Sequence, residues 1–392
     1  MQFEWSAEQS ALRKTFADLG RASAQRRASR RDGESSVHRF DGTCWSELAE
    51  AGLWRLAVPA DSGGQGGSWW DFAAAFEGLS STARSTGLLM TVANQASVIR
   101  AILTLGTVQQ RERHLASLLD GALSATAMSE PSTGSDVRGL QTRLSGTDGC
   151  YRLHGSKYNV SHAPTADLLL VIAKHAVRER EGVALLLIDR EVTGLTRSAP
   201  CETLGNRDLP IGELSFSDVD IRPEHLLGKP GEGHRHLMEI ASMSRVLFSL
   251  ASAHVLMPFL DDAVELVRRR RSFESTLDSH QYVQGRIVDM KLGIERTRWL
   301  SYAALGQVLT RADEAVMTAS LAKLTATQGI VDGALDLLRL FGSVGYRKGA
   351  VAEFVGDALG LLLAGGTEEM HRVNVFSQIA RLHQKAAAEA AA

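Results

Sequence analysis

The sequence predicts a mainly helical α+β protein in which a small β domain lies between two helical regions. Apolar residues recur at helical spacing through residues 1–121 and again through 231–392. Residues 122–230 instead hold short apolar runs that are separated by Gly, Asp, Asn and Pro. The chain has 392 residues, of which 44% are hydrophobic, which suits two or three domains with a large core. We therefore expect three domains with these boundaries.

The first domain is expected to consist of helices, with apolar faces in residues 72–79, 93–105 and 111–119. The glycine cluster at 59–67 interrupts this pattern. It lacks the Lys-Ser/Thr pair of a nucleotide-binding phosphate loop, lacks GxGxxG spacing, and has no strand-turn-helix context. We expect a plain turn there.

Basic residues gather in the first thirty or so residues and could indicate a transit peptide. Glu4, Glu8 and Asp18 argue against this interpretation, because transit peptides avoid acidic residues. The segment is more typical of an amphipathic surface helix whose basic side chains are solvated.

The later domains differ in their hydrophobic period. In the second domain, strands are expected at Tyr151–His154, Leu168–Ala173, Val183–Ile188 and Glu213–Val219. The second and third of these runs are apolar on both sides, which indicates strands buried on both faces. In the third domain, long helices are expected at 234–270, 281–310, 313–341 and 367–385. These helices would form an antiparallel bundle.

Composition argues against several classes of function. The formal net charge is −2, so no overall positive field points to nucleic acid or an acidic membrane surface. The three cysteines are scattered, with no CxxC pair and no histidine at metal-ligand spacing. We therefore expect no disulfide framework, no metal site and a reducing, cytoplasmic location. No apolar run approaches the ~18–20 residues of a membrane span, so we expect no membrane insertion.

Four places in the chain carry more specific patterns. They read Met-Ser-Glu-Pro-Ser-Thr-Gly-Ser-Asp at 128–136, Gly-Ser-Lys-Tyr-Asn-Val-Ser-His-Ala at 155–163, Arg-Arg-Ser-Phe at 270–273 followed by Gln281, and Arg-Leu-Phe-Gly-Ser at 339–343 with Gly-Gly-Thr-Glu-Glu at 365–369. In order and internal spacing they resemble the acyl-CoA dehydrogenase family of flavoproteins, and the resemblance spans nearly the whole chain. It implies an N-terminal helical domain, a small middle β-barrel domain, a C-terminal four-helix bundle, and FAD as the cofactor.

The resemblance also implies roles for residues of the β domain. Met128 and Ser129 would contact the flavin's pyrimidine ring, and Ser135 would reach the acyl thioester. Asn159 and Ser161 stand where the family has a Trp and a Thr that pack against the isoalloxazine. Loss of the Trp would open the flavin's face to solvent or to a bulkier ligand.

Other FAD contacts are implied in the third domain. Arg270, Phe273 and Gln281 match the residues that hold the FAD pyrophosphate and adenine across a subunit interface, with Glu274 in place of the usual Gly. An Arg fork suits a pyrophosphate, although a run of arginines is also typical of a solvated surface. The remaining implied FAD contacts are Arg339, Gly342, Ser343, Thr367 and Glu369. Arg339 and Ser343 depart from the family's Gln and Gly, and the shared sites imply a homodimer or homotetramer.

The family's usual base is missing. Most members carry a Glu just before a Gly-Thr pair, and it removes the substrate's α-proton while a hydride leaves the β-carbon. Here Gly365 precedes Gly366-Thr367. The isovaleryl and long-chain enzymes place their Glu before an Arg in another helix, and that position is Ser244, before Arg245. Gly365, Gly366, Ser244 and Arg245 are therefore implied substrate contacts, and the catalytic base is unassigned.

No other carboxylate is a convincing replacement. Glu239 lies about 140° around the helix from Ser244. Glu368 and Glu369 are more typical of first-turn acids in a helix capped by Gly366 or Thr367. Glu130 belongs to the flavin segment and is expected to point away.

The favoured hypothesis is an FAD-dependent oxidoreductase without the standard base, acting on an acyl thioester of CoA or an acyl carrier protein, in a setting such as bacterial biosynthesis. Its electron acceptor would be an electron-transfer flavoprotein or oxygen. One alternative is a flavin monooxygenase on the same fold, which needs no α-proton base. Another is a non-catalytic partner subunit of a heteromeric dehydrogenase. A DNA-associated role ranks last, because no basic extension follows the bundle.

Overall fold

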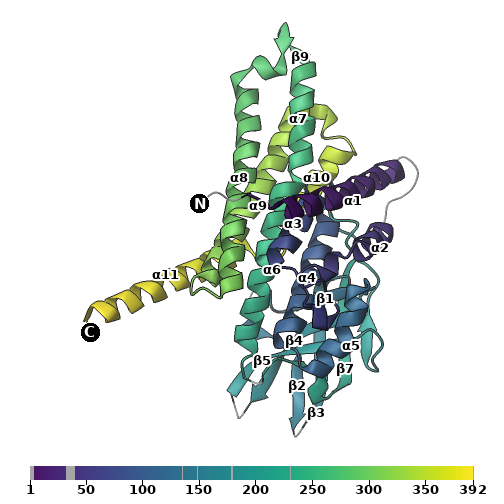
Figure 1. Cartoon of the computed structure of the whole chain (residues 1–392), viewed down its shortest axis with the longest axis vertical. Coiled ribbons are helices and arrows are strands. Elements are labelled where there is room, and N and C mark those ends of the chain that lie inside the picture. The colour runs from purple at the N-terminus through teal and green to yellow at the C-terminus, as the bar shows by residue number, and fades with distance from the viewer. Residues whose placement is uncertain are drawn as a thin grey trace.

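The computed structural model describes residues 4–31, 40–134, 136–147, 149–177, 180–229 and 231–391. Helices come first, strands follow, and helices return, as the sequence predicted (Figure 1). The helices of the first region are α1 (Ala7–Arg31), α2 (Gly42–Glu50), α3 (Trp69–Ser80), α4 (Thr86–Leu105) and α5 (Val108–Leu119). The glycine cluster forms a short 3₁₀ turn, Ala60–Ser62, within a loop, so the prediction of a turn is confirmed.

Arg13, Arg26 and Arg27 of α1 are bound by acids, so the prediction of solvated side chains was wrong for these three, whereas Lys14 and Arg21 are exposed as predicted. Arg13 contacts Glu77 of α3 at 2.7 Å, and Arg26 contacts Glu47 of α2 at 2.8 Å. Arg27 bridges to Asp208 at 3.1 Å. Sequence periodicity does not report these partners, because they lie far along the chain.

The β domain is built on one eight-stranded sheet. Its strands are β1 (Ser124–Ala127), β2 (Arg143–Thr147), β3 (Cys150–Ser161), β4 (Leu168–Val177), β5 (Arg180–Asp189), β6 (Leu195–Arg197), β7 (Ile211–Ile221) and β8 (Leu226–Leu227). They pair in the order β6-β7-β3-β2-β4-β5-β8, and β1 pairs in parallel with β4. The four expected strands are confirmed within β3, β4, β5 and β7.

Strand β4 is buried on both faces, as predicted. Leu168, Leu170 and Ile172 belong to the large core shared with the helices. Leu169 and Val171 belong to a second core inside the β domain. The strand therefore holds the β domain against the helices that carry the rest of the site.

The third region contains more helices than predicted. Its helices are α6 (Gly233–Val255), α7 (Met257–Arg269), α8 (Gln281–Thr310), α9 (Ala315–Phe341), α10 (Ala350–Gly360) and α11 (Glu368–Ala391). The expected single helix 234–270 is two helices, because Pro258 has no N–H to donate and starts α7 instead. Helix α10 was not predicted. Between α7 and α8 a small hairpin, β9 (Arg271–Ser272) with β10 (Ser275–Thr276), forms the tip of an arm (Figure 1).

The statement that no apolar run is long enough for a membrane span was wrong. Two described segments, Thr86–Leu105 and Gly233–Arg269, are long and apolar enough by composition. Both are mostly buried inside the fold, as the core helices of a folded domain are.

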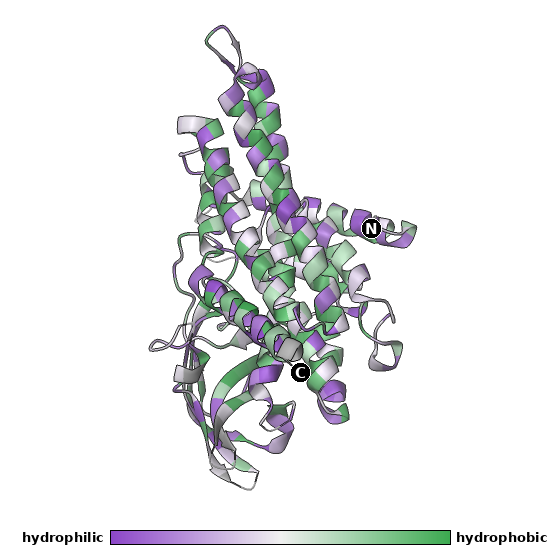
Figure 2. Ribbon diagram, turned by 90° about the vertical axis from the view of Figure 1, so that its left-hand side faces the viewer, coloured by the Kyte–Doolittle hydropathy of each residue, from purple (hydrophilic) through white to green (hydrophobic). Residues whose placement is uncertain are grey.

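Helices α8 and α11 expose apolar side chains. Figure 2 shows hydrophobic and hydrophilic positions alternating along α11, the helix that ends at the C label. The exposed large apolar residues on these two helices include Tyr282, Val288, Leu292, Val373, Phe376 and Ile379. Several exposed large apolar side chains on one helix are typical of an association surface.

Candidate active site

The turn that contains Gly365 connects α10 to α11. Gly365 and Gly366 have φ angles of +72° and +105°, which side-chain-bearing residues rarely adopt. The Thr367 hydroxyl accepts a hydrogen bond from the Met370 amide at 3.4 Å, so Thr367 caps α11. Glu368 is the first residue of the helix, as the first-turn interpretation predicted.

Lys323 of α9 lies directly beside this turn. A Cβ atom at position 365 would be 3.4 Å from Cε of Lys323 and 3.5 Å from the ring of Phe248. The lysine is buried, and its Nζ donates to the Thr327 hydroxyl at 2.6 Å and to the Leu361 carbonyl at 2.9 Å. Burial lowers the pKa of Lys323 to about 8. A lysine with a lowered pKa therefore packs beside the position from which the family's carboxylate side chain would start.

Arg245 of α6 is the second cation at this position. Arg245 is buried, with only 5% of its surface exposed. Nη2 lies 4.0 Å from the thioether sulfur of Met370, and Nε and Nη1 have no hydrogen-bond partner in the described part of the chain. Burial lowers the pKa of Arg245 to about 10. The guanidinium is thus buried without a counter-ion among the described residues.

His371 of α11 is the third titratable group. It is buried, and its Nε2 lies 3.2 Å from the carbonyl of Gly365. A carbonyl only accepts, so Nε2 carries the proton and Nδ1 is left as an acceptor. Burial, together with the positive charges of Arg245 and Lys323, lowers the pKa of His371 to about 3. The ring is therefore neutral at ordinary pH.

Ser244, the second position where the resemblance implies a base, lies on the same helix as Phe248. Ser244 is half-buried and precedes Phe248 by four residues, so both lie on one face of α6. Phe248 is the side chain that a Cβ at Gly365 would touch. The nearby acids are engaged elsewhere: Glu368 pairs with Arg372 at 3.5 Å and Glu239 pairs with Arg235 at 3.2 Å.

In the β domain, a buried ion pair fixes the segment that holds Met128 and Ser129. Nζ of Lys157 lies 2.7 Å from Glu130 and donates to the Met128 carbonyl at 2.8 Å. The Glu130 carboxylate also accepts from two backbone amides, at 2.6 and 3.0 Å. The Tyr158 amide donates to the Ser129 carbonyl at 2.9 Å. Glu130 is thus held by partners inside the β domain, which suits a structural role.

Strand β3 is irregular at Asn159, the position where the resemblance implies a Trp. The pairing of β3 with β7 shifts between Lys157 and Val160. Asn159 lies in this shift, is exposed, and has a φ of +51°. Ser161 is half-buried at the end of β3. Ser135, the expected thioester contact, lies outside the described residues.

The arm brings two predicted segments together. Nη1 of Arg270 donates to the Phe341 carbonyl at 3.2 Å and lies 3.9 Å from where a Cβ of Gly342 would be. Gly342 has a φ of +64°, so the turn presents bare backbone beside a guanidinium fork. Phe273, at the hairpin, is 90% exposed. A guanidinium fork beside bare backbone fits a pyrophosphate group.

The other arm residues frame that cradle. Gln281 is the first residue of α8, and Ser343 follows Gly342 in a 3₁₀ turn. Arg339 contacts Asp336 at 2.9 Å, so part of the charge it adds is neutralised. Glu369 is exposed on α11.

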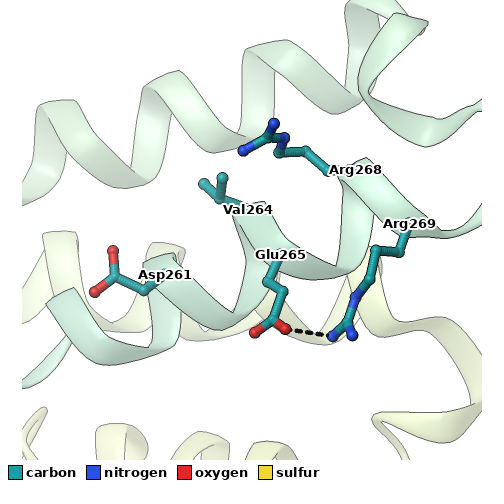
Figure 3. A pocket seen from close by; sticks show the side chains of 5 residues that line it. All are labelled: Asp261, Val264, Glu265, Arg268 and Arg269. Atoms are coloured by element: carbon teal, nitrogen blue, oxygen red, sulfur yellow. Dashed lines mark ion pairs between the residues drawn. The ribbon is translucent and has the colours of Figure 1, made fainter.

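A shallow hollow of about 380 Å³ lies on the outer face of α7, ahead of Arg270 (Figure 3). It is lined by Asp261, Val264, Glu265, Arg268 and Arg269. Glu265 and Arg269 pair across one turn at 2.6 Å. None of these residues was a predicted site residue, and their mutual pairing is typical of a solvated helix face.

Sequence reasoning missed Lys323, Phe248, Met370 and His371. One signal was present for His371, which follows Thr367 by four residues and so shares the face of the helix cap. Met370 lies on the same helix, three residues after Thr367, whereas Lys323 and Phe248 come from helices far from the Gly365 turn along the chain. Only packing brings them to it.

Comparison with known proteins identifies what these segments resemble. Three family models match in chain order: the N-terminal domain of acyl-CoA dehydrogenases at residues 6–122, the middle domain at 125–219 and the C-terminal domain at 231–380. L-prolyl-[peptidyl-carrier protein] dehydrogenase of Pseudomonas fluorescens is 28% identical over 339 residues, covering 84% of this chain and 88% of the relative. Benzylmalonyl-CoA dehydrogenase of Aromatoleum aromaticum is 28% identical over 387 residues, covering 97% and 100%. The structure of butyryl-CoA dehydrogenase from Megasphaera elsdenii superposes with a TM-score of 0.88 at 25% identity, covering 97% and 100%.

Proposed function

Because the chain belongs to the acyl-CoA dehydrogenase family, we propose that it oxidises an acyl thioester, carried by CoA or a carrier protein, with the segments named above as its FAD and substrate contacts. It is an FAD-dependent oxidoreductase that acts on CH–CH donors. The single observation that carries the assignment of its sites is the meeting of Arg270 with the Gly342 turn, two family segments some seventy residues apart. The domain limits 1–121, 122–230 and 231–392 remain part of this proposal.

FAD, when bound, accepts the hydride from the substrate's β-carbon. In this proposal the chain's own residues hold and orient the reactants. Arg270 and the bare backbone of Gly342 bind the pyrophosphate, and Met128 and Ser129, fixed by the Lys157–Glu130 pair, face the flavin. Phe248 and the Gly365 turn border the acyl group.

Simple saturated acyl-CoA substrates are expected to react slowly. A positioned general base contributes typically ~10²–10⁴-fold in rate, and neither position 365 nor position 244 supplies a carboxylate. The titratable side chains that pack around the Gly365 turn are two cations and a neutral imidazole. The nearest acid along the chain, Glu368, pairs with Arg372 and acts on Lys323. This site is therefore built for a substrate that differs from a plain fatty acyl chain.

A second copy of the chain is part of the proposal. The hairpin at the tip of the arm and the β domain lie at opposite ends of the molecule (Figure 1). Both ends hold segments that the family uses for FAD, so one chain alone supplies only parts of each site. The exposed apolar residues of α8 and α11 support a homodimer or homotetramer. An electron-transfer flavoprotein or oxygen as acceptor, and a cytoplasmic location, complete the proposal.

The comparisons do not favour the two alternatives. The curated relatives bear the names of dehydrogenases, and the match extends over all three domains. A flavin monooxygenase or a silent partner subunit thus has no specific observation behind it.

The direct test is anaerobic reduction of the bound flavin. The purified protein is expected to contain FAD, and its oxidised-flavin absorbance should fall when the right acyl-CoA or acyl-carrier-protein substrate is added. Mass spectrometry of the product should show the loss of two hydrogen atoms. Oxygen incorporation into the product, or FAD-loaded protein that no acyl thioester reduces, would overturn the proposal.

A further inference from the structure

We propose that Arg245 forms an anion site in front of the Gly365 turn, and that the acyl group of the substrate carries a carboxylate that binds there. This inference rests on the proposed function and narrows its substrate class. It starts from an unbalanced charge inside the protein.

Arg245 is only 5% exposed. Two of its three guanidinium nitrogens, Nε and Nη1, nevertheless donate to nothing in the described part of the chain. A buried charge without a partner is strongly unfavourable, and proteins avoid it by supplying a counter-ion. Burial alone accounts for the lowered pKa of Arg245, and even that value leaves the group charged at neutral pH. An anion from outside the chain would balance it.

The charged groups around Arg245 leave this role unfilled. Lys323 and His371, from α9 and α11, are a cation and a neutral ring. Glu368 at the start of α11 pairs with Arg372 and its charge acts on Lys323, and Glu239 on α6 pairs with Arg235, so neither acid balances Arg245. Lys323 already has two hydrogen-bond acceptors, whereas Arg245 has only the weak contact with the Met370 sulfur. Arg245 is therefore the cation that remains to be matched.

The turn presents bare, exposed backbone at the same place. Gly365 is exposed and carries no side chain, and the nearest atoms to a Cβ there are in ordinary contact at 3.4 and 3.5 Å. Met370 occupies the position that a Cβ of Gly366 would take and also contacts Arg245, and its unbranched thioether can change rotamer readily. A carboxylate that displaces Met370 would reach the guanidinium and make charge-assisted hydrogen bonds.

An acyl thioester with a terminal carboxylate fits these requirements. Its thioester end would lie towards the flavin segments, and its charged end would lie at the buried Arg. A carboxylate is planar and matches the guanidinium fork, which a neutral alkyl end does not.

The test compares matched ligands on the FAD-loaded protein. Non-reactive thioether analogues of succinyl-CoA, glutaryl-CoA and adipoyl-CoA are titrated by calorimetry against the analogues whose terminal carboxylate is replaced by a carboxamide. At least one carboxylate ligand should bind roughly 10–100-fold more tightly than its amide. If every amide binds as well as its carboxylate, the anion site is disproved while the proposed function stands. If no acyl thioether analogue binds, whether it is carried by CoA or by an acyl carrier protein, the proposed function fails as well.

Single-residue variants test whether Arg245 is the source of the preference for carboxylate over carboxamide ligands. Arg245→Gln should reduce the carboxylate-over-amide ratio to near one, and Arg245→Lys should retain part of it. Met370→Leu, which removes only the sulfur contact, should keep the ratio. FAD content and the melting temperature report whether each variant is folded. An Arg245→Gln protein that is folded and still prefers the carboxylate would overturn the assignment, and the native comparison decides the matter even if that variant does not fold.

Discussion

At the scale of single residues, Lys323 should leave a signature in the pH dependence of stability. Its pKa in the folded protein, about 8, lies below the ordinary 10.5, so the unfolded state binds more protons between these values. The free energy of unfolding should therefore rise with pH through this window. Compared with the Lys323→Met variant, the native protein's free energy of unfolding should increase by about 2 kcal/mol more as the pH is raised from 7.5 to 9.5.

Urea unfolding at a series of pH values measures this gain. Lys291→Met, which removes an exposed lysine of α8, is the matched control for the general effect of alkaline pH. A constant difference between native protein and Lys323→Met over this range would show that the buried amine does not titrate there.

Position 365 gives a second prediction. Gly365→Glu should fold, because the space admits a Cβ, but the left-handed backbone should make it about 1 kcal/mol less stable. The new carboxylate should raise the desaturation rate of butyryl-CoA at least tenfold, within the range of a placed general base. It should also pair with Arg245 and weaken the preference for carboxylate ligands.

Gly365→Gln separates the two effects, because it has the same size and strain without the base. Initial rates of flavin reduction on both variants give the comparison. Equal rates for the Glu and Gln variants would mean that more than the base is missing, and the loss of the flavin-facing Trp at Asn159 would become the next suspect.

At the scale of elements, Glu77 joins four helices through one carboxylate. It is buried in α3 and receives Arg13 of α1 at 2.7 Å, His254 of α6 at 3.3 Å, and the Tyr302 hydroxyl of α8. Burial alone would raise its pKa, but these partners lower the pKa of Glu77 to about 2. Glu77→Gln leaves the partners uncompensated and should lower the free energy of unfolding by about 3–5 kcal/mol.

The sign of the pH effect follows from the same values. The folded pKa lies below the ordinary 4.5, so the contribution of Glu77 is present above that value and is lost as the pH falls towards 2. Asp18→Asn, which removes an exposed pair with Arg21, is the control and should change stability by under about 1 kcal/mol. Chemical unfolding of the native protein, Glu77→Gln and Asp18→Asn at pH 7 and at pH 3.5 measures the loss of stability in each variant. A Gln variant whose deficit is the same at the two pH values would contradict the role of the charge.

The sequence predicted the helices best where a strong apolar period ran between clear ends. The expected 281–310 and 313–341 match α8 and α9 to within two residues. The error at 234–270 was avoidable, because Pro258 signals a boundary that the apolar period passes over. The core residues of β4 were also predictable, since a strand buried on both faces needs apolar residues at successive positions.

At the scale of the whole molecule, the sequence could name the flavin segments but not the contents of the site. Motifs such as Arg270–Phe273 are local, and they keep their spacing wherever the chain places them. The Lys323, Arg245 and His371 cluster has no local pattern, because three helices must pack before its members meet. A missing residue such as the Glu at 365 can be seen in a sequence, whereas the groups that replace it emerge only from the fold.

The division of the FAD site between copies of the chain gives the last prediction. Ser161→Trp should block the flavin end, and Arg270→Ala should weaken the pyrophosphate end, so each variant alone should retain little FAD. If each site takes its flavin end from one copy and its arm from another, a mixed pair holds one site with both halves intact and one with both halves altered. Random mixing by co-expression should then restore about a quarter of the native FAD content.

Mixing Arg270→Ala with Gly342→Val, both on the arm, should restore none, because every site then has an altered arm. Flavin content per chain, measured after separating assemblies by size, decides between the two arrangements: restoration in the first mixture alone requires shared sites, and equal FAD loss in both mixtures would mean that each chain builds its own.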